Sequence, residues 1–226
     1  RKTSRWDVEK ARFWAAKAQG SVRKMHSGIV SMVIDRYRDI VLADMDTTTF
    51  GEGQDALNDV WDELYEKSKL NDVIGEAIAA TLASGDGAFK ITADECSPYP
   101  IVEFYDAENV DYVYVHSTLR EIKFYTNYRG KDNKNLRLEE TYGFGYVRYK
   151  LYDDTGKEMP MDALPETAHL IDFGIEQDLM LAVPLKIMNS TRYKNRGKAL
   201  FDGKSDVLDG LDEVISQWID AVRMGR

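Results

Sequence analysis

The segment that comes nearest to a chemical motif runs from Gly197 to Ser205, directly before a predicted helix. Its sequence, Gly-Lys-Ala-Leu-Phe-Asp-Gly-Lys-Ser, is similar to a phosphate-binding loop, in which backbone amides and a lysine hold phosphate groups at a helix start. Five residues separate Gly197 from Gly203, whereas that loop has four, and the shorter spacing closes the amides around a phosphate. We therefore expect a turn at Gly203 and a helix capped by the Ser205 hydroxyl. A nucleotide-binding protein that uses this segment remains an alternative.

Few residues of the sequence could hold a metal or act as a nucleophile. The histidines, His26, His116 and His169, share no local spacing. The single cysteine, Cys96, rules out a disulfide framework and a cysteine-based zinc site. Two acidic residues precede it, and acidic neighbours raise the pKa of a thiol and make it less reactive. We expect no metal, no cofactor and no cysteine nucleophile.

The carboxylates also predict no catalytic pair. Residues 44–54 are partly spaced like a calcium-binding loop, but Thr49 stands where that loop needs glycine and Asp55 where it needs glutamate. Glu139 and Glu140 are neighbours on a predicted strand, so they point to opposite faces.

A basic cluster is the clearest charge feature near the C-terminal end of the sequence. Four basic residues occur without an acid in this short stretch: Arg192, Lys194, Arg196 and Lys198. Such a cluster suits contact with DNA phosphates or with an acidic face of another subunit. A solvated loop is the alternative.

Two longer blocks of opposite charge occur in the N-terminal part. Residues 1–24 contain eight Lys or Arg against two acids, and residues 44–66 contain eight acids and no base. Opposite blocks on one chain can join neighbouring copies head to tail, which closes into a ring where the rotation permits. We expect Asp59, Asp62 and Glu63 to contribute to an intersubunit acidic face.

Hydrophobic periodicity divides the chain into three parts. Residues 1–85 are predicted to be helical, with helices over 5–19 and about 27–43, then two amphipathic helices that form a helical hairpin around a joint at 67–69. Residues 186–226 are predicted to hold the basic loop and a long amphipathic helix that starts near Ser205.

Residues 86–185 alternate with a period of two, which predicts an antiparallel sheet built from hairpins. Ten of the 13 tyrosines of the chain lie in this part, and tyrosine suits a half-buried sheet face. A short strand over 179–183 is also possible, which Pro184 would end or confine to a sheet edge. Helices, then sheet, then helix predict an α+β fold.

Composition limits the classes of function. The chain has 226 residues and a net charge of −9, which argues against non-specific binding of nucleic acid. It contains no run of about 18 apolar residues, so we expect no membrane span.

Four stretches together resemble the portal proteins of tailed bacteriophages and prophages. They are His26-Ser27-Gly28-Ile29 through Ile40-Val41-Leu42-Ala43, the helix, glycine turn and strand of 70–91, the strand pair of 142–154 with Gly156, and 203–226 with its Leu-Asp-Glu-Val-Ile-Ser core. The order and spacing of these pieces carry the resemblance, which extends over most of the chain.

The resemblance implies a structural protein and not an enzyme. It would be a subunit of a ring, a dodecamer in the virion, that sits at one capsid vertex. Double-stranded DNA would pass through the ring during packaging and ejection. Terminase, scaffold or capsid proteins and head-completion proteins would dock on it, in the bacterial cytoplasm during assembly and later in the virion. Of the wing, stem, clip and crown, this chain would supply the wing, and 186–226 would lead toward the stem. Another phage structural or docking module, using the tyrosine-rich sheet, is the alternative.

The resemblance carries over to few residues, and none of them is catalytic. Gly85 and Gly87 match the turn from helix to strand. Gly203 and Ser205 match the Gly-x-Ser before the last helix. Leu211, Asp212 and Glu213 match the acidic stretch that follows this Gly-x-Ser in the family. Asp212 and Glu213 are expected to act between subunits or in packing of the wing.

Overall fold

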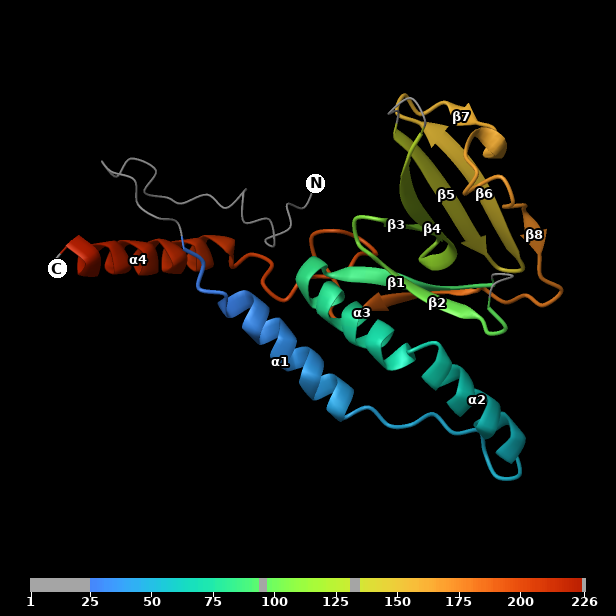
Figure 1. The fold of residues 1–226 in the computed structure, drawn as a ribbon, viewed down its shortest axis with the longest axis horizontal. Helices are drawn as coiled ribbons and strands as arrows, with labels where there is room; N and C mark the ends of the chain where they lie inside the picture. The colour runs from blue at the N-terminus through green and yellow to red at the C-terminus, as the bar shows by residue number, and fades with distance from the viewer. Residues whose placement is uncertain (1–24, 94–96, 131–134, 225–226) are drawn as a thin grey trace.

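The computed structural model describes residues 25–93, 97–130 and 135–224. The predicted helix over 5–19, the rest of the basic block 1–24, and Cys96 lie outside the described residues. The fold is α+β, as predicted, with helices first, antiparallel sheets next and a long helix last (Figure 1).

The N-terminal helices are α1 (Ile29–Ala43), α2 (Asp55–Lys67) and α3 (Leu70–Ser84). Helices α1 and α3 lie side by side in opposite directions (Figure 1) and bury Ile34, Ile78 and Leu82 between them. Helix α2 meets α3 end to end at Lys69, whose φ of 48° turns the chain there. Both helices predicted on either side of the joint at 67–69 are present, but they do not fold back on each other as predicted; the antiparallel neighbour of α3 is α1.

The strands form two sheets where one central sheet was predicted. The smaller sheet has the order β2-β1-β9, from β1 (Asp86–Thr92), β2 (Ile101–Asp106) and β9 (Ala182–Lys186). Pro184 lies in β9, which is an edge strand, as expected for a residue without a backbone N–H. The pairing of β9 with β1 joins residues that are 92 to 100 positions apart in the sequence, so no local pattern predicts it.

The larger sheet has the order β3-β4-β5-β6-β7, and β8 pairs with β6 on the same edge as β7, at the other end of that strand. Its strands are β3 (Val110–Val115), β4 (Thr118–Arg129), β5 (Asn135–Gly143), β6 (Tyr146–Asp153), β7 (Glu158–Met159) and β8 (Phe173–Gly174). Alternate residues of β4, such as Ile122 and Phe124, are fully buried, as the period of two predicts.

The core lies between the two sheets, and α3 covers the opposite face of the smaller one (Figure 1). Phe124 of β4 packs edge to face against Tyr105 and Tyr142, with ring centroids 5.3 and 5.2 Å apart. Such aromatic pairs stabilise a core beyond the area that they bury. Several of the tyrosines that the sequence concentrates here therefore serve the core.

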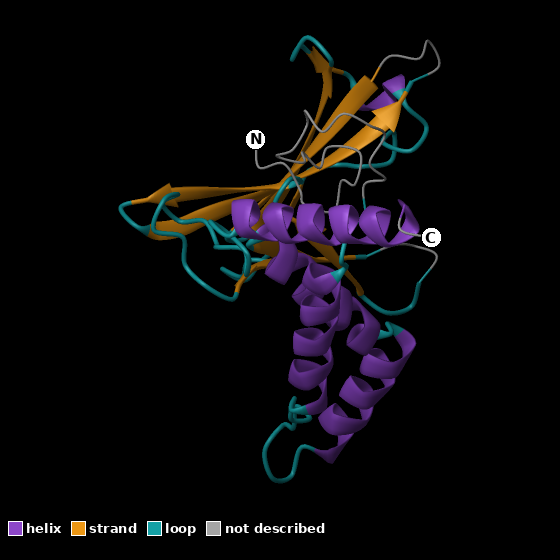
Figure 2. Cartoon of the chain, turned by 90° about the vertical axis from the view of Figure 1, so that its left-hand side faces the viewer, coloured by secondary structure: helices purple, strands orange, loops and turns teal. Residues whose placement is uncertain are grey.

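The last helix, α4 (Ser205–Met224), runs crosswise to α1 and α3 (Figure 2) and projects away from the sheets (Figure 1). Gly203 before it has a φ of 76°, so the predicted turn is present. Ser205 is the first helical residue.

Candidate interaction surfaces

The basic loop, residues 187–204 between β9 and α4, contains one base that is held inside the chain. The Nη2 atom of Arg196 lies 3.0 Å from Oδ1 of Asp86, which is fully buried. Its guanidinium group also donates to the carbonyl oxygens of Val110 (2.8 Å) and Ala107 (2.6 Å). We therefore correct the prediction for Arg196: its charge is used within the fold, at the connection between the two sheets.

Two glycines fix the loop at the end of α3. A Cβ atom on Gly197 would lie 1.9 Å from the carbonyl oxygen of Gly85, so only glycine fits there. The Gly197 amide donates to the Asp86 carboxylate. Gly85 itself has a φ of 109°, a conformation that favours glycine. The helix-to-strand turn predicted at Gly85 and Gly87 is thus also the point where the basic loop docks, and Asp86 between them is the residue that sequence reasoning missed.

The backbone amides of the phosphate-loop-like segment have protein partners. The Gly197 amide donates to Asp86, the Lys198 amide to the carbonyl oxygen of Met188 (2.8 Å), and the Leu200 amide to that of Leu82 (2.9 Å). A phosphate cradle needs several free amides that converge on one anion. This arrangement disfavours the nucleotide-binding alternative.

Three bases of the loop remain as candidates for contact with a partner. Arg192 and Lys194 are exposed, and Lys198 is half-buried. The Arg192 guanidinium lies 5.5 Å from the centre of the Tyr193 ring. A basic and aromatic surface of this kind suits an acidic partner.

The acidic face predicted on α2 lies at the other end of α3 from the basic loop. Asp59, Asp62 and Glu63 share one side of α2, because residues three and four apart are neighbours on a helix. Asp59 and Asp62 are exposed, whereas Glu63 accepts a hydrogen bond from the Tyr99 hydroxyl. The 15 residues of α3 separate the two charged surfaces by about 22 Å. Opposite charges at opposite ends suit head-to-tail association.

Asp212 joins α4 to the start of α1. Its two carboxylate oxygens accept hydrogen bonds from the Ser27 amide and from Nδ1 of His26, both at 2.9 Å. Nearby, the Met25 amide donates to the Ser216 hydroxyl (3.0 Å). Of the two roles predicted for Asp212, the structure places it in packing within the chain. Glu213 accepts from Gln217 in the same helix.

Replacing Asp212 by asparagine is expected to lower the free energy of unfolding at pH 7 by about 1 kcal/mol. Burial alone would raise the pKa of Asp212, but the hydrogen bonds from Ser27 and His26 outweigh it and hold that pKa below its ordinary value. The contribution is therefore complete above the unfolded pKa of about 3.9 and is lost as the pH falls through the lowered folded pKa.

Urea unfolding of both proteins at pH 7 and at about pH 3 measures this difference, and it should shrink at the lower pH. Glu213→Gln is the matched control, because its hydrogen bond is exposed and within one helix. A loss for Glu213→Gln as large as that for Asp212→Asn would contradict the role given to Asp212.

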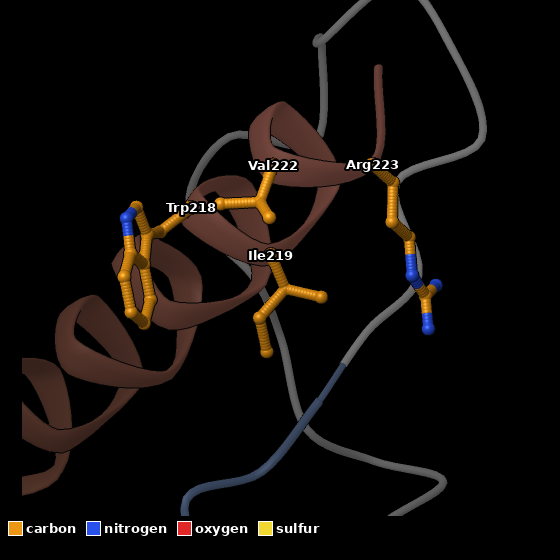
Figure 3. Close-up of a pocket in the computed structure, with 4 residues that line it drawn as sticks. All are labelled: Trp218, Ile219, Val222 and Arg223. Atoms are coloured by element: carbon orange, nitrogen blue, oxygen red, sulfur yellow. The ribbon is translucent and has the colours of Figure 1, made fainter. Parts of the chain in front are cut away.

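Helix α4 carries an exposed apolar stripe. It consists of residues at helical spacing: Val207, Leu211, Val214, Trp218 and Val222. Trp218 is 68% exposed and Val214 63%. A hollow of about 280 Å³ lies along the last turns of this helix. Its lining residues are Trp218, Ile219, Val222 and Arg223 (Figure 3). Leu211, predicted from the resemblance, is thus part of this stripe.

Helices α1 and α2 also expose apolar side chains. Met32 and Ile40 of α1 are 68% and 59% exposed, and Val60 of α2 is 58% exposed. A second apolar hollow of about 520 Å³ lies where α1, α3 and the smaller sheet meet, with Tyr37, Ile74, Phe89 and Leu185 in its wall. Contiguous apolar surface of this kind is typical of proteins that associate with others.

The outward tyrosines of the larger sheet are engaged within the chain. The Tyr146 hydroxyl donates to Glu121, and the Tyr125 hydroxyl donates to Asp111 (3.3 Å). The Arg137 guanidinium lies 4.7 Å from the centre of the Tyr125 ring. These contacts favour a solvated sheet face over the docking face of the alternative reading.

No family model matches this chain, and no curated protein matches it in sequence.

Among residues 25–93, 97–130 and 135–224, no group of three or more His, Cys, Asp or Glu could hold a metal ion. None of the helices in that part of the chain combines the length and the apolar character needed to cross a membrane.

Proposed function

We propose that this chain is the wing part of a phage or prophage portal subunit, a structural component of a homo-oligomeric ring. The ring would be a conduit for double-stranded DNA and a docking point for terminase and head-completion proteins. The observation that carries the proposal is the exposed apolar surface on α1 and α2 beside a well-packed core between the sheets. A chain that packs its sheets fully but leaves these two helices partly uncovered suits burial against neighbours.

The distribution of charge supports the same proposal. The acidic face of α2 and the basic loop lie at opposite ends of α3, so one copy can present its acids to the bases of the next. The net charge of −9 also suits a conduit. An acidic protein does not hold DNA phosphates tightly, so DNA can slide through the channel during packaging and ejection.

The first test is negative-stain microscopy of the full-length natural protein that contains this chain. We expect rings with a central hole. Single compact particles at concentrations well above micromolar would contradict the proposal and would favour a docking module.

A charge-reversal variant, Asp59→Lys with Asp62→Lys, tests the acidic face in the same protein. We expect at least a roughly tenfold rise in the concentration needed for assembly, because like charges would then meet across the interface. Glu63 stays unchanged because it holds Tyr99. Glu176→Lys with Asp178→Lys is the control. It makes the same change in charge on exposed residues of the loop between β8 and β9, away from α2. Assembly that responds equally to both pairs would show that net charge acts instead of this face.

A further inference from the structure

We propose that the apolar stripe of α4 is the docking site of the basic N-terminal segment, residues 1–24 of the same chain. The inference does not depend on ring formation. It rests on three observations: the exposed stripe, the place where the described chain begins, and the opposite charges of the two segments.

The stripe has the form of a helix-binding face. Val207, Leu211, Val214, Trp218 and Val222 follow the spacing of one side of a helix. The hollow beside Trp218 (Figure 3) has room for an apolar side chain from a partner. Leaving so much apolar surface in water is unfavourable, and covering it would be favourable by roughly 25 cal/mol per Å².

The described chain begins against α4. Met25 exchanges hydrogen bonds with Ser216, and the Ser27 amide donates to Asp212. The preceding segment therefore starts at the middle of the helix. A tether of this length keeps the segment at a high effective concentration near the stripe. A helix over 5–19, as the sequence predicts, would be about 22 Å long and α4 is about 30 Å long, so α4 is long enough to cover such a helix along its whole length.

The two segments are also complementary in chemistry. Helix α4 carries five acids and one base: Asp206, Asp209, Asp212, Glu213, Asp220 and Arg223. Residues 1–24 carry eight bases and two acids, and they include the large apolar side chains of Trp6, Phe13 and Trp14. A second copy of α4 is a poorer occupant, because its acids would face the acids of the first.

Photo-crosslinking in the whole chain tests the proposal. Trp218 is replaced by the photoreactive amino acid p-benzoylphenylalanine, and the crosslinked peptides are identified by mass spectrometry. We expect crosslinks from position 218 to residues 1–24. The control places the same amino acid at Val60, which is similarly exposed on α2, and should give at least fivefold fewer crosslinks to residues 1–24.

Two further results decide the details. Mixing isotopically light and heavy chains before irradiation should leave every crosslink within one chain; crosslinks between light and heavy chains would overturn the assignment to the same chain. The variant Arg5→Glu with Lys10→Glu, Arg12→Glu and Lys17→Glu should reduce the crosslink at 218 at least fivefold. No crosslink to residues 1–24, or an equal yield from Val60, would overturn the proposal.

Discussion

Replacing Lys90 by alanine is expected to lower the free energy of unfolding by about 3 to 5 kcal/mol. Lys90 of β1 is 4% exposed and lies between the two sheets. Its ammonium group donates to Glu140 of β5 at 2.7 Å and lies 3.2 Å from Glu103 of β2. It also lies 4.7 Å from the centre of the Tyr105 ring. Without Lys90, the Glu140 carboxylate would be buried without its partner, and that is the origin of the loss.

Lys90 stays protonated over the whole neutral pH range. Burial would lower the pKa of Lys90, but the charge and hydrogen bond of Glu140 outweigh it and hold that pKa well above its ordinary value. A raised pKa means that the ion pair contributes fully below the ordinary lysine pKa of about 10.4 and is lost only as the pH rises through the folded value. The deficit of Lys90→Ala should therefore be constant between about pH 6 and pH 9.

Urea unfolding of Lys90→Ala beside Lys150→Ala measures the effect of burial directly. Lys150 pairs with Glu158 at 3.2 Å, and both side chains are exposed, so its loss should lower stability far less than the loss of Lys90. The double variant Lys90→Met with Glu140→Leu should recover most of the stability, because an apolar pair of similar volume replaces the buried ions. A Lys90→Ala loss no larger than that of Lys150→Ala would show that the pair is solvated.

Lys90 also shows how far the sequence predicts this fold. Alternation in β1 places Phe89 and Ile91 on one face and Lys90 on the other, which indicates a polar, solvated second face. Both faces of β1 are in fact covered, by α3 and by the larger sheet. The helices that begin at Ile29, Asp55, Leu70 and Ser205 and the hairpin strands follow local patterns, and these predictions are confirmed. The second sheet and the buried ion pair depend on contacts between distant segments, which periodicity does not report.

Some features of the candidate surfaces can likewise be predicted from local sequence, and others cannot. The acids of α2 and the apolar stripe of α4 are visible as helical spacing, because one helix face contains the whole feature. In the sequence, charge alone does not distinguish Arg196 from its basic neighbours. Its partner Asp86 stands between two glycines, and a lone acid in a Gly-Asp-Gly turn is the one signal that could have indicated a buried site.

Arg196→Ala is expected to lower the free energy of unfolding by about 3 kcal/mol or more, because it would leave the fully buried carboxylate of Asp86 without its cation. The carbonyl oxygens of Ala107 and Val110 would lose their donors as well. Arg196→Lys should recover part of the loss at most, since one ammonium group cannot reproduce the planar fork of a guanidinium.

Arg192→Ala and Lys194→Ala are the matched controls, because these bases belong to the same loop but are exposed. Each should change stability by less than about 0.5 kcal/mol. Urea unfolding of the three variants separates two interpretations of the cluster. If Arg196 served a partner as its neighbours are proposed to do, its removal would leave unfolding unchanged and weaken association only. The structure predicts the opposite: Arg196→Ala should lower stability, because this guanidinium group neutralises a buried carboxylate. Arg192→Ala and Lys194→Ala should leave stability nearly unchanged, because these exposed bases are the ones available to an acidic partner.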